Sequence, residues 1–130
     1  MTTDKHRLTQ INEITDKIIG CAYTVSNVLG AGFLEKVYEN AMNIGLHKTG
    51  LLIEKQKPIS VFYETQIVGD YFADFCIENL VIVELKAVKS IETNHEAQLM
   101  NYLRACNLRC GLIINFGTSK IGIKRMLNGF

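Results

Sequence analysis

Residues 69–86 read G-D-Y-F-A-D-F-C-I-E-N-L-V-I-V-E-L-K, and this stretch decides the fold. Its apolar residues predict two β-strands that form a hairpin around residues 78–79. Asp74, Glu84 and Lys86 nevertheless stand among those apolar residues. Because an unpaired ion in an apolar setting is strongly unfavourable, these three charges need a compensating partner. A bound cation is one candidate for that partner.

The hairpin register decides whether the two carboxylates meet. Side chains alternate between the faces of a strand, so Glu84 and Lys86 are expected to share a face with Leu80. An odd-numbered loop centred on Asn79 sets Asp74 directly opposite Glu84, with Cβ atoms about 5 Å apart. A two-residue loop instead turns Asp74 to the other face. The residues alone leave both registers open.

The remaining elements follow from apolar spacing and turn signals. We expect helices over residues 9–29, 34–49 and 94–107, short strands over 51–54 and 59–63, hairpin strands over 67–77 and 80–87, and strands over 111–116 and 121–127. Residues 55–58, which end in the only proline, should form a turn between the short strands near a sheet edge. Thr93 and Glu96 match a capping box at a helix start. This order predicts one α/β (α+β) domain over residues 1–130, with a mixed sheet flanked by helices.

Each predicted helix has an apolar stripe that should face the core. For the first helix the stripe comprises Ile11, Ile14, Ile18, Cys21, Ala22, Val25 and Leu29. For the second helix it comprises Val37, Ala41, Ile44 and Leu46. For the third it comprises Leu99, Met100, Leu103 and Cys106.

The composition is that of an ordinary globular protein, with 48% apolar and 21% charged residues. No apolar run approaches the ~18 residues of a membrane span, and no apolar signal core follows the first residues, so we expect a cytoplasmic protein that does not engage membranes. The net charge of +1 gives no general attraction to nucleic acid, so such binding needs a local patch. The four cysteines lack C-x-x-C spacing and are expected to be reduced core thiols.

Two carboxylates held close together repel each other unless a divalent cation lies between them. Mg²⁺ is bound by one or two carboxylates together with waters and phosphate oxygens. Such an ion lowers the pKa of bound water and neutralises charge on a phosphoryl group under attack. Lys86 would then orient the water or stabilise the developing negative charge. The alternative is a buried ion-pair network of Asp74, Glu84 and Lys86 without metal, and spacing alone does not separate the two.

Three motifs in this chain resemble those of one family. Asp74, followed by the E-L-K of residues 84–86, resembles the D…E-x-K signature of the PD-(D/E)XK nuclease superfamily, which has a restriction-endonuclease-like fold. Gln98 and Tyr102 resemble the Q-x-x-x-Y motif of its RecB-like and lambda-exonuclease-like branch. Residues 32–38, G-F-L-E-K-V-Y, match G-x-x-E-x-x-Y, the signature of a family of small PD-(D/E)XK proteins. The matches extend over residues 11–125.

The resemblance implies a Mg²⁺- or Mn²⁺-dependent nuclease. Asp74 and Glu84 would be metal ligands, with the backbone carbonyl of Leu85 as a third. Glu35 matches an acidic residue that reaches the metal or its water shell in related nucleases, and Lys86 would be the catalytic lysine.

The motif on the third helix carries a further expectation. Gln98 and Tyr102 match residues that position the lysine or contact the nucleic-acid backbone. The expected partner is nucleic acid, with DNA favoured over RNA. A chain of 130 residues has little surface left for sequence recognition, so any specificity would need a partner or a homo-oligomer.

One departure from the family pattern supports a second interpretation. Where relatives carry V-H-x-x-L-G-P-G, residues 25–32 read V-S-N-V-L-G-A-G, so Ser26 replaces a histidine. The alternative function is therefore a catalytically inactive nuclease-fold protein that acts as a nucleic-acid-binding or protein-interaction module.

Overall fold

The structure is a computed structural model that describes residues 2–129. Within these residues, five strands form one sheet in the order β1-β2-β3-β4-β5. The elements in chain order are α1 (Thr2–Leu29), α2 (Glu35–His47), β1 (Ile53–Tyr63), β2 (Gln66–Ile77), β3 (Val81–Lys86), α3 (Thr93–Cys106), β4 (Cys110–Asn115) and β5 (Gly122–Leu127).

The sheet is mixed, as the sequence predicts. β1, β2 and β3 form an antiparallel meander, and β4 pairs antiparallel with β5. β3 and β4 run parallel, which requires a crossover connection, and α3 supplies it. The expected mixed sheet flanked by helices is therefore confirmed.

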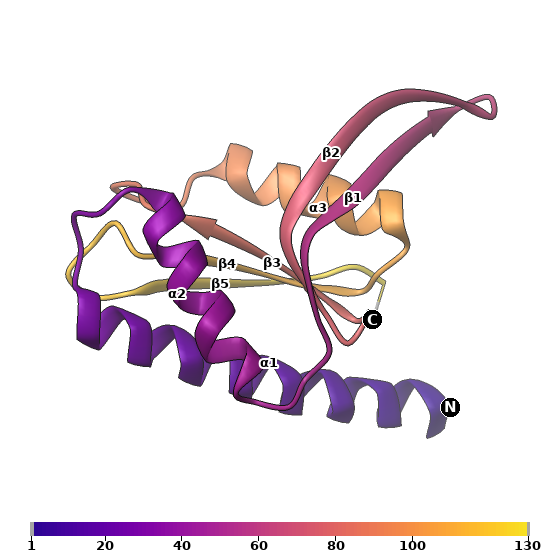
Figure 1. Ribbon diagram of the computed structural model, residues 1–130. Coiled ribbons are helices and arrows are strands. Elements are labelled where there is room, and N and C mark those ends of the chain that lie inside the picture. The colour runs from indigo at the N-terminus through magenta and orange to yellow at the C-terminus, as the bar shows by residue number, and fades with distance from the viewer. Residues whose placement is uncertain (1, 130) are drawn as a thin grey trace.

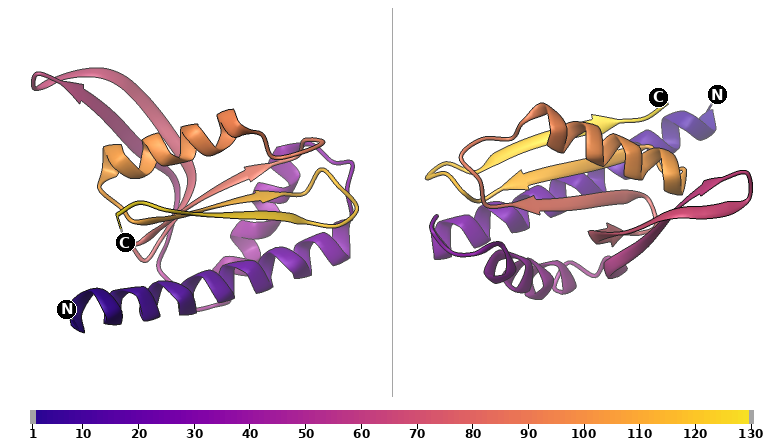
Figure 2. Two further views of the ribbon diagram at one scale, coloured as in Figure 1. Left: turned by 180° about the vertical axis from the view of Figure 1, so that it is seen from behind. Right: turned by 90° about the horizontal axis from the view of Figure 1, so that it is seen from above.

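The helices cover both faces of the sheet (Figures 1 and 2). α1 and α2 pack on one face, where their apolar stripes meet Phe75, Val83 and Leu85. α3 packs on the other face, in a second cluster that contains Ile82 and Ile113. The predicted α1 stripe is confirmed, since its members are buried or partly buried in the first cluster. None of the helices in the described residues combines the length and apolarity needed to cross a lipid bilayer.

The predicted apolar face of α2 is wrong at two positions. Ile44 is 62% exposed and Val37 also faces solvent, whereas Tyr38 and Met42 are fully buried. The buried stripe starts at Tyr38 and repeats every four residues, one position away from Val37. Tyrosine and methionine are weaker markers of burial than branched aliphatic residues, so the pattern favoured the wrong side of the helix.

β1 is one continuous strand rather than two short ones. Pro58 lies within it, opposite Phe72, and β1 pairs with β2 alone, so the proline occupies an edge strand as its chemistry requires.

β1 is irregular at two places: Gln56 has a left-handed backbone with φ at 54°, and the register with β2 shifts between Val61 and Phe62. The inward side of β1 changes between Ile53 and Ile59: Ile53 packs with α1 and α2 on one face of the sheet, and Ile59 packs with α3 on the other.

Other differences are small. α1 begins at Thr2, seven residues before the predicted start. Its first turns carry few apolar residues, so apolar spacing does not mark them as helical. The N-cap of α3 is Glu92 rather than Thr93, and the backbone N–H of Glu92 donates to His95 Nδ1 at 3.0 Å. In α3, Tyr102 joins Leu99 and Leu103 as a buried residue. The predicted strand over residues 121–127 is confirmed as β5.

The cysteines are free thiols, as predicted. Cys76 and Cys110 are buried, whereas Cys21 and Cys106 are only partly buried.

Candidate active site

The β2–β3 hairpin has the register that brings the carboxylates together. Phe75 pairs with Val83 and Ile77 with Val81, which leaves a three-residue connection centred on Asn79. Continuing this register by one step sets Asp74 opposite Glu84. The odd-numbered alternative is therefore confirmed. The expected place of Leu80 is wrong, because Leu80 lies in the turn and packs on the α1–α2 side.

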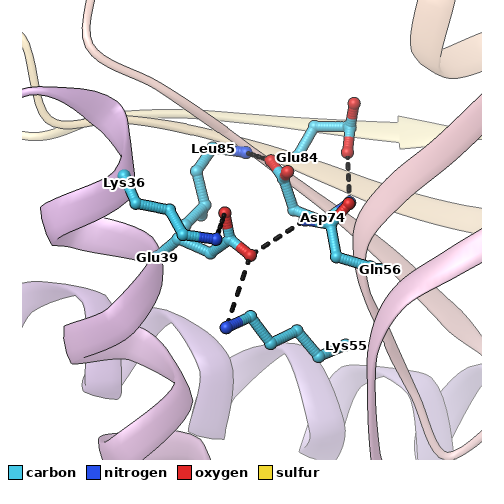
Figure 3. A network of polar contacts seen from close by, with 7 residues as sticks. All are labelled: Lys36, Glu39, Lys55, Gln56, Asp74, Glu84 and Leu85. Carbon is cyan, nitrogen blue, oxygen red and sulfur yellow. Dashed lines mark hydrogen bonds and ion pairs between the residues drawn. The ribbon is translucent and has the colours of Figure 1, made fainter.

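Where the backbone hydrogen bonds between β2 and β3 end, the two carboxylates accept hydrogen bonds from backbone N–H groups of the opposite strand. The Asp74 N–H donates to Glu84 Oε2 at 2.7 Å, and the Leu85 N–H donates to Asp74 Oδ2 at 2.7 Å (Figure 3). Two strands that separate at this point would otherwise leave these amides without partners. Each carboxylate thus has one oxygen engaged by the opposite strand.

Burial raises the pKa of both acids, and negative charges nearby add to the rise: Glu39 for Asp74, and Asp74 for Glu84. Glu84 is 7% exposed, and its burial, together with the charge of Asp74, raises its pKa to about 8. Burial also raises the pKa of Asp74. The positive charge of Lys86 opposes both shifts without cancelling them. The pair therefore holds a proton near neutral pH unless a further cation compensates its charge.

We expect Glu84→Gln to stabilise the metal-free protein above neutral pH. Between its ordinary pKa of 4.5 and its folded value of about 8, Glu84 binds a proton when folded but not when unfolded. The free energy of unfolding of the wild type should therefore fall as pH rises through this range. The glutamine amide does not titrate, so Glu84→Gln lacks this pH dependence. Its free energy of unfolding should exceed that of the wild type by on the order of 2 kcal/mol at pH ~8 and should be close to the wild-type value at pH ~5.

Urea unfolding in EDTA at several pH values measures this difference. Glu64→Gln, at an exposed turn, is the matched control and should leave the pH dependence unchanged. Parallel stability curves for wild type and Glu84→Gln would contradict the raised pKa.

Glu35 opens α2 close to the paired acids. Partial burial, and next the charge of Asp74, raise the pKa of Glu35, while Lys86 opposes the rise. The helix start is held in place by Tyr38, whose hydroxyl donates to Gly30 O at 2.7 Å and accepts from the Phe33 N–H at 3.2 Å. The Tyr38 ring stacks on Phe116 at 4.6 Å. In the G-x-x-E-x-x-Y segment the tyrosine thus fixes the loop that precedes Glu35.

Gln98 and Tyr102 lie on one side of α3 and line a common groove. Tyr102 is buried, and its burial, followed by the charge of Glu84, raises its pKa. Gln98 is exposed, and within residues 2–129 no hydrogen bond joins it to Lys86 or to either carboxylate. The structure therefore places Tyr102 near the acids, whereas Gln98 lines the same groove without a hydrogen bond to them in the described part of the chain.

Two polar residues that lie beside the acids, Glu39 and Gln56, were not predicted from the sequence. Glu39 is buried, accepts a hydrogen bond from Gln56 Nε2 at 2.8 Å, and lies 3.6 Å from Lys36 Nζ and 3.8 Å from Lys55 Nζ (Figure 3). Its spacing of four residues from Glu35 on a helix could have indicated a shared side. Gln56 offers no such signal, because its position opposite Asp74 depends on the register of β1.

The available donors are suited to a hard divalent cation. Among residues 2–129, no cluster of three or more His, Cys, Asp or Glu side chains forms a ready-made cage. Two neighbouring carboxylates, at the point where the β2–β3 pairing ends, nevertheless match the way Mg²⁺ is held, through one or two carboxylates with the remaining positions taken by water. The donor chemistry thus fits Mg²⁺ or Mn²⁺ and does not fit a cysteine-ligated metal.

An antiparallel meander, a helical crossover to a parallel strand, and helices on both faces define a restriction-endonuclease-like fold. The chain belongs to the PD-(D/E)XK nuclease superfamily, whose family model matches residues 12–126. The paired acids and Lys86 lie within this matched region.

A solved structure supports the fold. The crystal structure of SSO0001 superposes with a TM-score of 0.57 at 17% sequence identity, over 96% of this chain. The aligned region covers 62% of the SSO0001 chain, so this protein spans less than two thirds of that length. The comparison with curated proteins gives no match.

Proposed function

We propose that this protein is a Mg²⁺- or Mn²⁺-dependent nuclease of the G-x-x-E-x-x-Y type, in the RecB-like branch, and that it hydrolyses phosphodiester bonds of DNA or RNA, with DNA the favoured substrate. The observation that carries the proposal is the opposition of Asp74 and Glu84 at the point where the pairing of β2 with β3 ends, with Lys86 on the Glu84 side of β3. Membership of a nuclease superfamily supplies the reaction class.

The proposal gives each site residue a role that its position allows. Asp74, Glu84 and the carbonyl of Leu85 would hold the ion, and Glu35 would reach its water shell. A bound divalent cation supplies an acidified water and charge neutralisation at the phosphate. Lys86 orients the attacking water and stabilises the negative charge that develops on the phosphate.

Tyr102 and Gln98, both on α3, would act on the bound nucleic acid rather than on the metal. Tyr102, buried beside the acids, would position Lys86 or contact the nucleic-acid backbone. Gln98, exposed on the same groove, would contact the backbone of the bound strand.

A second candidate function is a non-catalytic nucleic-acid-binding or protein-interaction module. It is favoured by the reciprocal hydrogen bonds of Asp74 and Glu84, which satisfy one oxygen of each acid without any ion. In this case Lys86 would serve only to balance the buried charge.

Metal-dependent thermal stability separates these functions. Millimolar Mg²⁺ or Mn²⁺ should raise the melting temperature of the wild type by about 4 °C or more, since a ligand bound only by the folded state stabilises it. Asp74→Asn should remove this rise, because it deletes a charged ligand. The comparison is made for each protein with and without ion, since removing the repulsion between the acids also changes the metal-free value.

Asp70→Asn is the matched control. Asp70 is exposed on the same strand and accepts a hydrogen bond from Ser60 Oγ at 3.1 Å, so its replacement should leave the rise intact. A wild-type melting temperature that does not respond to either ion would count against the nuclease and for the non-catalytic module.

A further inference from the structure

A groove of about 800 Å³ lies between the β1–β2 hairpin and α3. In Figures 1 and 2 the hairpin rises away from the body of the sheet on the side that α3 occupies. Tyr102 lies in the groove, and it packs in the same cluster as Ala73 and Ile82. Asp74 and Glu84 do not line the groove themselves. Ala73 adjoins Asp74 and Ile82 shares its face with Glu84, so the Tyr102 end of the groove lies beside the paired acids.

The hairpin wall of the groove carries exposed aromatic rings. Phe62 is 62% exposed and Tyr71 is 46% exposed. The Tyr71 ring lies 5.7 Å from that of Tyr102, at an interplanar angle of 43°. A Cβ at Gly69 would come within 3.0 Å of Tyr71 Cε2, so the absence of a side chain at Gly69 lets the ring rest on the hairpin. The wall is thus a supported aromatic platform.

The helix wall is polar. Asn94, Gln98, Asn101 and Arg104 follow one another at intervals of three or four residues, so they project on one side of α3 into the groove. Three amides offer hydrogen-bond donors and acceptors together, and Arg104 adds a positive charge. None of the groove-lining residues in the described chain is acidic.

We propose that this groove binds single-stranded nucleic acid, with unpaired bases stacked on Phe62 and Tyr71 and base edges and phosphates contacted by the amides and Arg104. This deepens the proposed function and rests on it for the delivery of a phosphate to Asp74 and Glu84. Stacking on aromatic side chains requires a free base face, which a duplex does not offer. A cation in a groove whose lining residues include no acid suits the phosphate backbone.

The amide wall favours nucleic acid over a second copy of the chain. The hairpin also exposes apolar side chains outside the groove, namely Tyr63 and Ile67 beside its turn and Phe72 in the middle of β2, which self-association would cover. That arrangement would leave Asn94, Gln98 and Arg104 without a role, whereas a single strand uses both walls.

Binding is tested by fluorescence anisotropy in EDTA, so that cleavage plays no part. The probes are labelled single-stranded DNA, single-stranded RNA of the same sequence, and the DNA duplex. Wild type should bind a single strand at least about 10-fold more tightly than the duplex. Tyr71→Ala and Phe62→Ala should each weaken single-strand binding by about 10-fold, the expected loss of one stacked base. Tighter binding of DNA or of RNA identifies the sugar that the groove accepts.

Phe72→Ala is the matched control. Phe72 is 58% exposed, directly follows Tyr71 and does not line the groove, so its replacement should change affinity less than about 2-fold. Tyr71→Phe keeps the ring and should retain binding, which separates stacking from a folding defect.

Three outcomes would overturn the groove proposal: duplex bound as tightly as single strand, equal losses for Tyr71→Ala and Phe72→Ala, or a dimer in sedimentation that both variants convert to monomer. The last result would assign the hairpin to self-association. These readouts are independent of metal and cleavage. Single-strand binding without a metal response would reject the nuclease alone, and a metal response without single-strand binding would reject the groove alone.

Discussion

Replacing Lys86 with methionine should slow nucleic-acid cleavage about 100- to 1,000-fold, the usual loss when one group that stabilises developing charge is removed. Lys86 is half-buried, and its charge opposes the burial-driven rise in the pKa of Asp74, Glu84 and Glu35. Methionine preserves most of the side-chain volume, so the protein should remain folded. The melting temperature should still rise with Mn²⁺, because both carboxylate ligands remain. Rates of oligonucleotide cleavage in Mn²⁺ measure the effect.

Lys89→Met is the matched control. Lys89 is an exposed lysine three residues further along the chain, and its replacement should leave the rate within about 2-fold of the wild type. Equal cleavage by wild type and Lys86→Met would mean that the activity belongs to a contaminant or that Lys86 has no part in the chemistry.

Gly117→Ala should destabilise the fold by about 3 kcal/mol, the upper end of overpacking effects. A Cβ at Gly117 would lie 2.2 Å from Val88 O and 2.4 Å from Val88 N, and backbone atoms cannot turn aside as a side chain can. Asn115 fixes this contact: its Oδ1 accepts from the Val88 and Gly117 N–H groups, both at 3.0 Å, and its Nδ2 donates to Val88 O at 2.9 Å. Any shift that admits the methyl group therefore loses hydrogen bonds as well.

Gly122→Ala is the comparison that isolates the clash. A Cβ at Gly122 would meet Asn115 Cβ at 3.6 Å and Ile91 Cδ1 at 3.7 Å, which are ordinary contacts. This variant should be as stable as the wild type or slightly more stable, since alanine is less flexible than glycine in the unfolded chain. Urea unfolding measures both. Similar losses for the two variants would contradict the packing argument.

The register of the β2–β3 hairpin was partly predictable from the sequence. Side-chain alternation reduced the question to two registers, and the alternative that placed Asp74 opposite Glu84 is the one observed. The mixed sheet and the buried stripe of α1 were also predictable, because long periodic segments bury the faces that their apolar residues mark. The roles of the site residues remain predictions.

The parts that were not predictable depend on contacts between distant segments. Burial of Glu39 depends on Gln56 and Lys55, which β1 brings alongside α2. Continuity of β1 through Pro58 depends on its place at the sheet edge, which local sequence suggests but does not fix. The position of Gln56 depends in turn on its left-handed backbone, a conformation that glutamine rarely adopts.

Pro58 has a further consequence for the protein in concentrated solution. An edge strand presents unpaired N–H and C=O groups on which strands from other molecules can add, and apolar side chains nearby strengthen such aggregation. β1 is an edge strand, and Phe62 and Tyr63 near its end are exposed. Pro58 removes a donor midway along this edge, and Lys55 and Lys57 place charge beside it. The edge strand is thereby protected against adding strands from neighbouring molecules, while the aromatic rings near its end stay accessible.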